Sequence, residues 1–225
     1  MIKLNPVLKD YLWGGMKFGK MYGRDNGGKK MSESWEVSVH PDGLSTCEGG
    51  TLADYLAKDP QAVDKAGSPF PVLIKYIDAA QNLSVQVHPD DEYARRVEND
   101  NGKTEMWYIL GADGKLRPLH VEKAVGVINF KAFEDHTNTG TFAAVAGGRM
   151  RRLTGCKYFG CRLLDLDGTY SEENKISFTA LNVLKGEGKA DGKPFKAGDS
   201  FFVPCGEKFT LEGKAEIVLT TEGKA

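Results

Sequence analysis

The sequence has few cysteines, and their placement excludes two classes of protein. The four cysteines are Cys47, Cys156, Cys161 and Cys205, and no two of them form a Cys-x-x-Cys pair. Neither a cysteine-rich zinc module nor a disulfide framework is therefore expected. We expect reduced and mostly buried thiols.

Charge of one sign and long apolar runs are also missing. The formal net charge is −1, which gives no reason to expect a nucleic acid or an anionic membrane as partner. No apolar stretch approaches the length that crosses a bilayer. The first residues, Met1–Pro6, lack the basic and then apolar layout of a secretion signal, so the expected location is the cytoplasm.

Glycine, by contrast, is abundant, with 27 residues against 9 prolines. Together with many short apolar runs, this favours a protein of strands and turns. Thr51 and Asp54 resemble a capping box at the start of a helix. In the first half, strands are predicted at 34–40, 70–78, 82–88 and 104–110, and helices at 51–56, 60–65, 90–97 and 119–125.

The pattern of predicted elements changes after about residue 140. Short strands alternate with glycine turns, which indicates a small antiparallel barrel or sandwich. We place a domain boundary between residues 131 and 150, and divide the chain into 1–140 and 141–225. The strands predicted in the second part are 162–166, 176–184, 199–203 and 215–220.

Three polar residues of the first half form the main candidate site. Gln86 and His88 lie two residues apart on a predicted strand, so their side chains leave the same face. Glu105 begins the next predicted strand. Imidazole, carboxylate and amide groups suit Zn²⁺ or another borderline divalent ion. By spacing alone the signal is weak, since a single histidine before Pro89 is as well explained by a capping or hydrogen-bonding role.

A resemblance to a known family strengthens this interpretation. The stretches Leu83–Tyr93 and Gly102–Tyr108 are similar to the signature of type I phosphomannose isomerases. Further landmarks of that family occur in family order and cover nearly the whole chain: Tyr11–Gly15, Glu33–Ser38, His40–Gly43 and Gly114–Ala124.

The resemblance implies a zinc-dependent isomerase of mannose 6-phosphate and fructose 6-phosphate. It implies that His88 and Glu105, with Gln86, hold one zinc ion. Ser84 and Lys103 resemble substrate-pocket positions, and Lys103 suits a phosphate or sugar oxygen. Trp13, Glu33 and Trp35 line the same cavity in one interpretation, and in the other they are a paired carboxylate and buried aromatics of structural importance.

Two family features are missing from the sequence. The family's remaining zinc histidine follows a proline-alanine-glycine turn, and its catalytic arginine follows threonine and tyrosine; neither segment is present. The chain runs directly from Leu110 through Gly111-Ala112 to Asp113, which indicates an internal deletion around residues 110–113. Arg117 corresponds to a separate downstream position. No residue is assigned as the general base.

No other residue is a convincing replacement for the lost ligand. His40 directly precedes Pro41, and this pair is typical of a turn. His120 lies on a predicted helix, and His136 lies in an acidic and polar loop. Cys205 and Glu207 have suitable ligand atoms, but a turn cysteine and a solvated glutamate are the simpler interpretation.

The segment Gly198–Phe209 resembles the second cupin motif, with Phe209 in the place of the metal-binding histidine. The expected fold is therefore mostly β. It comprises a truncated cupin-like (jelly-roll type) N-terminal region with a few helices, followed by a second, metal-free cupin-like barrel in which Phe209 is buried.

Three functional hypotheses follow from the sequence. The favoured one is a zinc-dependent isomerase of phosphosugars with impaired activity, because a ligand and an arginine are missing. The second is a catalytically dead homologue that binds a metal or a phosphosugar. The third is a decayed product whose open sheet edge, where the deletion falls, promotes association.

Overall fold

The computed structural model describes residues 1–24, 26–84, 86, 88–111 and 140–223. The chain divides into two compact units. The first combines Met1–Gln81 with Asn138–Ala225, and the second is Asn82–Thr137. The predicted division at residues 140 and 141 stays a prediction.

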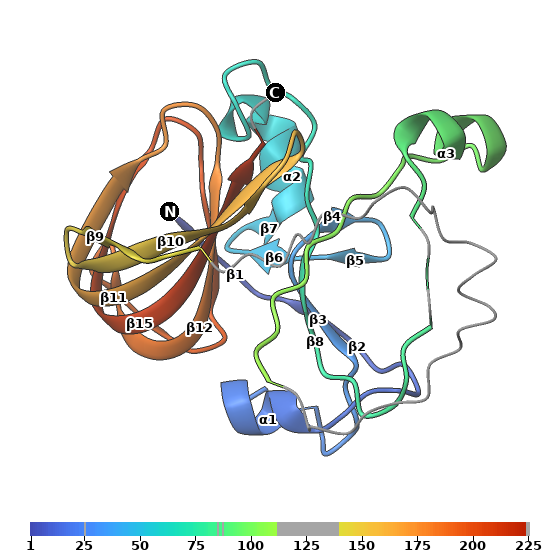
Figure 1. Ribbon diagram of the computed structural model, residues 1–225, viewed down its shortest axis with the longest axis horizontal. Helices are drawn as coiled ribbons and strands as arrows, with labels where there is room; N and C mark the ends of the chain where they lie inside the picture. The colour runs from blue at the N-terminus through green and yellow to red at the C-terminus, as the bar shows by residue number, and fades with distance from the viewer. Residues whose placement is uncertain (25, 85, 87, 112–139, 224–225) are drawn as a thin grey trace. The chain divides into compact units, whose positions relative to one another are not determined.

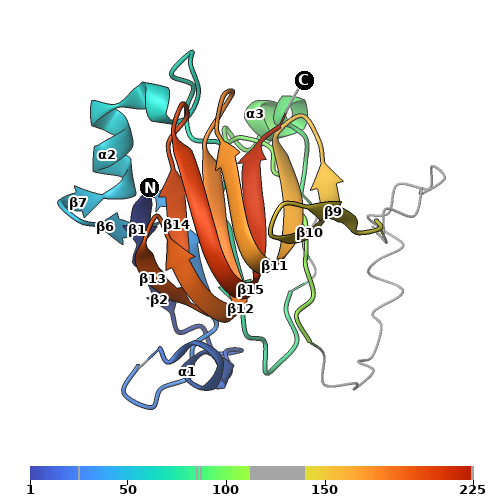
Figure 2. The ribbon, with the colours of Figure 1, turned by 90° about the vertical axis from the view of Figure 1, so that its left-hand side faces the viewer.

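The larger part of the first unit is an antiparallel sheet of eight strands (Figures 1 and 2). β13 (Lys193–Lys196) pairs only with β12 (Thr179–Ala190) and lies off the main strand order. Along that path the order is β1 (Ile2–Leu4), β14 (Ser200–Val203), β12 (Thr179–Ala190), β15 (Lys208–Glu222), β11 (Phe159–Glu173), β10 (Gly148–Gly155) and β9 (Ala143–Val145). The predicted strands of the C-terminal part are confirmed, and several are longer than the sequence indicated.

Glycines placed side by side allow the three longest strands to bend together. Gly168 of β11 pairs with Gly213 of β15, which in turn pairs with Gly188 of β12. A Cβ atom on Gly213 would lie 2.5 Å from the carbonyl oxygen of Glu187, and its φ is +136°. Only glycine combines this conformation with so close an approach. The sheet therefore curls at this column and encloses its apolar face.

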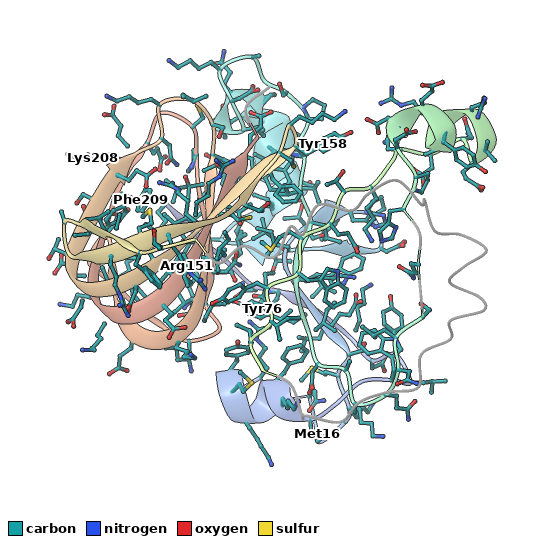
Figure 3. The ribbon with its side chains drawn as sticks, viewed as in Figure 1. Met16, Tyr76, Arg151, Tyr158, Lys208 and Phe209 are labelled. Carbon is teal, nitrogen blue, oxygen red and sulfur yellow. The ribbon has the colours of Figure 1, made fainter. Side chains whose placement is uncertain are left out.

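The inside of the curled sheet is an apolar core. Phe209 is 1% exposed and lies within it (Figure 3), which confirms its predicted burial. Its neighbours from the same face of the sheet include Leu164, Leu181, Phe201 and Leu219. Full burial of each such side chain contributes about 1.5–3 kcal/mol to stability. The space around Phe209 inside the curled sheet is thus filled with hydrocarbon.

The remaining strands of this unit are short. β2 (Val7–Lys9), β3 (Glu33–Val37) and β8 (Ile74–Ile77) form a three-stranded antiparallel sheet. Two small hairpins follow β3: β4 (Val39–His40) with β5 (Gly43–Leu44), and β6 (Thr46–Cys47) with β7 (Gly50–Thr51). A second apolar cluster joins this region to the large sheet, with Phe178 and Phe202 stacked at 5.6 Å between ring centroids.

The helices are short, and their ends follow local sequence rules. α2 (Leu52–Lys58) begins with the predicted capping box, in which Thr51 and Asp54 bond each other's backbone N–H. The predicted helix at Pro60 is a single 3₁₀ turn, η1 (Pro60–Ala62). The second unit contains α3 (Asp91–Val97), again as predicted. α1 (Lys17–Tyr22) was not predicted. It is capped at its C-terminal end by Gly23, whose backbone is in the left-handed conformation. Within the described residues no helix is both long and apolar enough to cross a membrane.

Two strand predictions of the second unit are wrong. None of residues 82–84, 86, 88 and 104–110 is assigned to a strand. The backbone hydrogen bond that joins the two segments runs from Lys103 N–H to Pro89 C=O, beyond the end of each apolar run. A sequence with high β propensity forms a strand only where a neighbouring strand supplies the ladder of hydrogen bonds. The helix predicted at 119–125, together with Arg117, His120 and His136, lies outside the described residues.

β3 is buried on both faces, although polar and apolar residues alternate along it. All five of its residues are buried. The second face carries Ser34 and Glu36, which are buried because Arg24 donates hydrogen bonds to both. The polar residues that alternate along this strand therefore belong to a buried network of hydrogen bonds.

Candidate active site

The second unit holds its two site segments together around the start of α3. Asp90 caps the helix by accepting a hydrogen bond from Tyr93 N–H, and Asp91 accepts one from Gly102 N–H at 3.0 Å. A Cβ atom on Gly102 would lie 2.5 Å from the backbone of Asp90 and Asp91. Glycine at this position therefore lets the segment with Lys103 approach the segment with His88.

Glu105 is the centre of the resulting cluster. Its Oε2 lies 3.0 Å from Nε2 of His88, and its Oε1 lies 2.5 Å from Nζ of Lys103. The indole N–H of Trp107 donates to Oε2 at 3.3 Å. The side chains of His88 and Glu105 are 23% and 26% exposed, so solvent reaches both. The expected convergence of His88 and Glu105 is present, although irregular segments rather than adjacent strands produce it.

The electrostatic surroundings of Glu105 favour its charged form. Partial burial by itself raises the pKa of the carboxyl group, because it removes water from the charge. Hydrogen bonds from Lys103 and Trp107, the positive charge of Lys103 and the neighbouring imidazole of His88 outweigh this effect. The pKa of Glu105 is consequently lowered. The carboxyl group is therefore ionised at neutral pH and accepts hydrogen bonds.

The donor set suits zinc in kind but not in number. In tetrahedral zinc sites two ligand atoms lie roughly 3.4 Å apart, and the His88–Glu105 distance of 3.0 Å is close to that value. Gln86 is exposed, and its amide nitrogen donates to Ser84 Oγ at 3.3 Å. Within the described part of the chain, no three His, Cys, Asp or Glu side chains form a group able to hold a metal ion.

Glu33 and Trp35 lie in the first unit and contact each other. The carboxylate of Glu33 accepts a hydrogen bond from the Trp35 indole at 2.7 Å and another from Lys75 Nζ at 2.9 Å. Lys75 was not singled out from the sequence. Its signal was that it is the one charged residue inside the apolar run from Phe70 to Ile77.

Trp13 also lies in the first unit, within a tight turn. Its side chain is half-buried, and its ring centroid is 5.9 Å from that of Tyr11. The backbone carbonyl of Trp13 accepts hydrogen bonds from the N–H groups of Ala80 and Gln81. The assignment of Trp13 and Glu33 to the substrate cavity stays a prediction.

The alternative ligands have other roles in the structure. His40 is the last residue of β4, and its Nδ1 accepts a hydrogen bond from Asp42 N–H. Glu207 lies 2.8 Å from the terminal ammonium of Met1. Burial raises the pKa of the Cys205 thiol, which disfavours the thiolate that binds metals.

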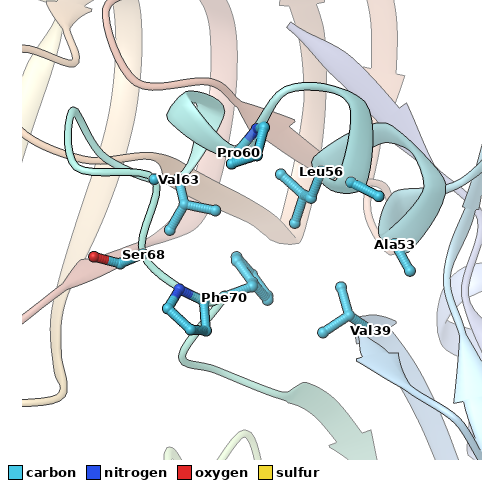
Figure 4. Close-up of a pocket in the computed structure, with 10 residues that line it drawn as sticks. Val39, Ala53, Leu56, Pro60, Val63, Ser68 and Phe70 are labelled. Atoms are coloured by element: carbon cyan, nitrogen blue, oxygen red, sulfur yellow. The ribbon is translucent and has the colours of Figure 1, made fainter.

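An apolar hollow of about 300 Å³ lies elsewhere in the first unit (Figure 4). Leu56 from α2, Pro60 from η1, and Phe70 contribute to its lining, and Val39 of β4 faces them. Its lining contains no titratable side chain. It therefore offers shape and hydrocarbon but no acid, base or metal ligand.

Sequence comparisons agree with the landmarks described above. A sequence model for phosphomannose isomerase type I, catalytic domain, matches residues 1–124, and one for the mannose-6-phosphate isomerase cupin domain matches residues 150–222. The Bacillus subtilis protein named "Probable mannose-6-phosphate isomerase GmuF" is 46% identical over 114 residues. That match covers 48% of this chain and 36% of GmuF, so the chain spans little more than a third of this relative.

A second relative matches nearly end to end. Mannose-6-phosphate isomerase ManA of Bacillus subtilis is 26% identical, and the alignment covers 96% of each chain. It extends over 306 positions although this chain has 225 residues, so ManA has many positions without a counterpart here. This difference agrees with a deletion inside the chain.

Solved structures show the same fold. The mannose 6-phosphate isomerase of Bacillus subtilis matches with a TM-score of 0.78 at 20% identity, over 97% of this chain and 98% of that one. The apo enzyme of Salmonella typhimurium matches with a TM-score of 0.76 at 14% identity, over 99% of each chain. The cupin-domain match and these likenesses confirm the predicted mostly β, cupin-like fold class.

Proposed function

This chain belongs to the type I phosphomannose isomerases, and on that premise we propose that it interconverts mannose 6-phosphate and fructose 6-phosphate with reduced activity. The observation that carries the proposal is the cluster of His88, Glu105 and Lys103. It lies within the region that matches the family's catalytic domain. We further propose that the reaction takes place in the cytoplasm, where the four free cysteines stay reduced.

Each residue of the cluster has a proposed role. His88 and Glu105 hold one zinc ion, and Gln86 adds an amide oxygen after rotating away from Ser84. Lys103 has an exposed ammonium group that suits a phosphate or sugar oxygen, and Ser84 adds a hydroxyl group. The same ammonium group keeps Glu105 ionised, so substrate binding and metal binding depend on one another.

The reaction moves a proton between C1 and C2 of the sugar, and negative charge develops on the oxygen atoms during the transfer. Zinc, when bound, supplies a Lewis acid that stabilises this charge. From the chain itself, Lys103 supplies a positive charge that orients the substrate. A general base has no assigned residue, because none of the carboxylates described so far is both free of a partner and close to the cluster.

Reduced activity follows from the number of ligands. Catalytic zinc sites ordinarily use three protein ligands and keep one position open. The cluster offers two strong donors, and the third donor is a neutral amide. A weakly held ion, together with the lost arginine, lowers turnover, since one missing charge-stabilising donor costs roughly 10²–10³ in rate.

A coupled isomerase assay with added zinc tests the proposal. The comparison is between this chain and a version in which the missing block is restored from ManA. We expect measurable turnover from the present chain and at least a hundredfold higher turnover from the restored version. Equal turnover would show that the retained residues are sufficient and that activity is not impaired.

The alternative function is binding without turnover, and the two-donor cluster specifically favours it. It is distinguished by measuring zinc and mannose 6-phosphate binding calorimetrically with the same protein. Binding of either ligand without zinc-dependent turnover would support the catalytically dead homologue and overturn the isomerase proposal. Binding of neither ligand would overturn both.

A further inference from the structure

The turn that carries Trp13 is held more firmly than a surface turn requires. Gly14 N–H closes it on Tyr11 C=O at 2.9 Å. Gly15 N–H is shared between the carbonyl groups of Met31 and Asp78, both at 3.0 Å. These bonds, with the two that the Trp13 carbonyl accepts from Ala80 and Gln81, attach the turn to the end of β8.

Asp78 fills the space beside Gly15. Asp78 is 4% exposed, and its Oδ2 accepts a hydrogen bond from Lys17 N–H at 2.6 Å. A Cβ atom on Gly15 would lie 2.6 Å from Cγ of Asp78 and closer still to Oδ2. The φ of Gly15 is outside the left-handed region, so the requirement for glycine here is steric. Gly15 and the Asp78 carboxylate therefore fit each other as a matched pair.

A buried carboxylate at this position is costly unless its hydrogen bonds are made. The Lys17 amide supplies a short one, and the Lys17 ammonium lies 3.9 Å from Oδ1. Both partners come from the residues just after the turn. The carboxylate thus connects the end of β8 to the chain that leaves the turn, and an apolar side chain of similar size would not.

We propose that Asp78 is a positioning residue that fixes the Tyr11–Gly15 turn and, through it, Trp13. As a contribution to substrate binding the inference rests on the proposed function and on the predicted assignment of Trp13 to the substrate cavity. The carbonyl group of Trp13 in turn holds the backbone N–H groups of Ala80 and Gln81, which precede Ser84 and His88 in the sequence. Asp78 acts through Trp13 and does not itself touch the substrate.

Fluorine NMR of protein labelled with 5-fluorotryptophan tests the positioning directly. The chain has three tryptophans, Trp13, Trp35 and Trp107. Asp78→Ala is expected to shift and broaden the Trp13 resonance while leaving the other two in place. Asp78→Asn keeps an acceptor for Lys17 N–H and is expected to retain the original resonance. Asp167→Ala, which removes an exposed carboxylate paired with Lys214, is the matched control.

Gly15→Ala tests the same contact from the other side. The added methyl group collides with the Asp78 carboxylate, so the Trp13 resonance should move in this variant too. In the double variant Gly15→Ala/Asp78→Ala the methyl group no longer meets a carboxylate, but Lys17 N–H still lacks its acceptor, so the Trp13 resonance should match that of Asp78→Ala and not that of the parent chain. If Asp78→Ala fails to fold, Gly15→Ala still tests the contact between the two residues.

Activity provides a second readout that separates the two proposals. Asp78→Ala should raise KM for mannose 6-phosphate by about three- to tenfold with little change in kcat, and Asp78→Asn should restore KM. An inactive parent chain would refute the isomerase proposal while the fluorine spectra still decide the role of Asp78. An unchanged Trp13 resonance in Asp78→Ala or Gly15→Ala, or equal shifts of all three resonances, would overturn the positioning role.

Discussion

Arg24 and Glu36 form a two-pronged ion pair in the interior of the first unit. Nη1 of Arg24 lies 2.5 Å from Oε1 of Glu36, and Nη2 lies 3.0 Å from Oε2. Arg24 also donates to the carbonyl of Gly198, and Ser200 donates to Glu36. The pair therefore bonds β3 to the strand β14 of the large sheet, and it explains why polar residues alternate through a strand that is buried on both faces.

Breaking this pair on one side should destabilise the protein strongly. Arg24→Met or Glu36→Leu leaves a buried charge without a partner, which costs about 3–5 kcal/mol. Removing both charges should cost clearly less than the sum of the single changes. Denaturant unfolding measures the free energies. Lys185→Met, which breaks an exposed ion pair with Glu216, is the control and should cost less than about 1 kcal/mol. Additive single effects would contradict the coupling.

The capping box of α2 should give the helix a dependence on acid pH. Hydrogen bonds from the Thr51 side chain and backbone lower the pKa of Asp54 below its ordinary value of 3.8. Because the folded pKa is depressed, the stabilisation is present above the unfolded pKa and is lost as the pH falls through the folded one. Carbon NMR titration of the Asp54 carboxyl group measures the midpoint.

Variants of Thr51 show whether the hydroxyl group causes this shift. Thr51→Val keeps the shape without the hydroxyl and should raise the Asp54 midpoint toward 3.8. Thr51→Ser keeps the hydroxyl and should leave the midpoint low. A low midpoint in Thr51→Val would mean that the hydroxyl group is not responsible for the shift.

The glycine column of the large sheet should tolerate no side chain. Gly213→Ala adds a Cβ atom 2.5 Å from the Glu187 carbonyl at a φ of +136°, so we expect a loss of about 3 kcal/mol from backbone strain and overpacking. Gly192→Ala is the control, because φ is +77° there but a Cβ atom has open space. Its cost should be about 1 kcal/mol. Equal losses in thermal or denaturant unfolding would show that φ alone matters and that close packing of the strands does not.

Zinc binding should depend on the two strong donors of the second unit. His88→Ala or Glu105→Ala removes one of two converging ligands, so zinc affinity should fall by more than about tenfold. Competition with a chromophoric chelator measures it without any need for activity. His40→Ala changes a histidine at the end of β4, in the other unit, and should leave the affinity unchanged. Loss of affinity in His40→Ala alone would place the site elsewhere.

Some elements could be predicted because their causes lie within a few residues. The Thr51–Asp54 capping box and the acidic start of α3 are local interactions, and both helices form where expected. The segments at 82–88 and 104–110 have equally suggestive sequences, yet their described residues do not form strands. Strand formation depends on a neighbouring strand that is often distant in the sequence, so residue pattern alone could not decide it.

The candidate site divides along the same line. Residue type and family pattern single out His88, Glu105 and Lys103 from the sequence alone, since ligand chemistry can be inferred from side-chain identity. The 3.0 Å approach of His88 to Glu105 is a tertiary fact that depends on Gly102 packing against Asp90. Lys75 was missed because its partner Glu33 lies 42 residues away in the sequence.

The sequence by itself determined the family, the starts of α2 and α3 and the chemical character of the candidate site residues, because motifs, caps and side-chain identities are properties of short segments. Only the tertiary structure decided how the large sheet curls at Gly168, Gly188 and Gly213 and how Asp78 fits against Gly15. The same holds for the burial of both faces of β3. Each of these is a contact between segments distant in the chain, and its energy depends on close approach and the removal of water, which exist only once the chain has folded.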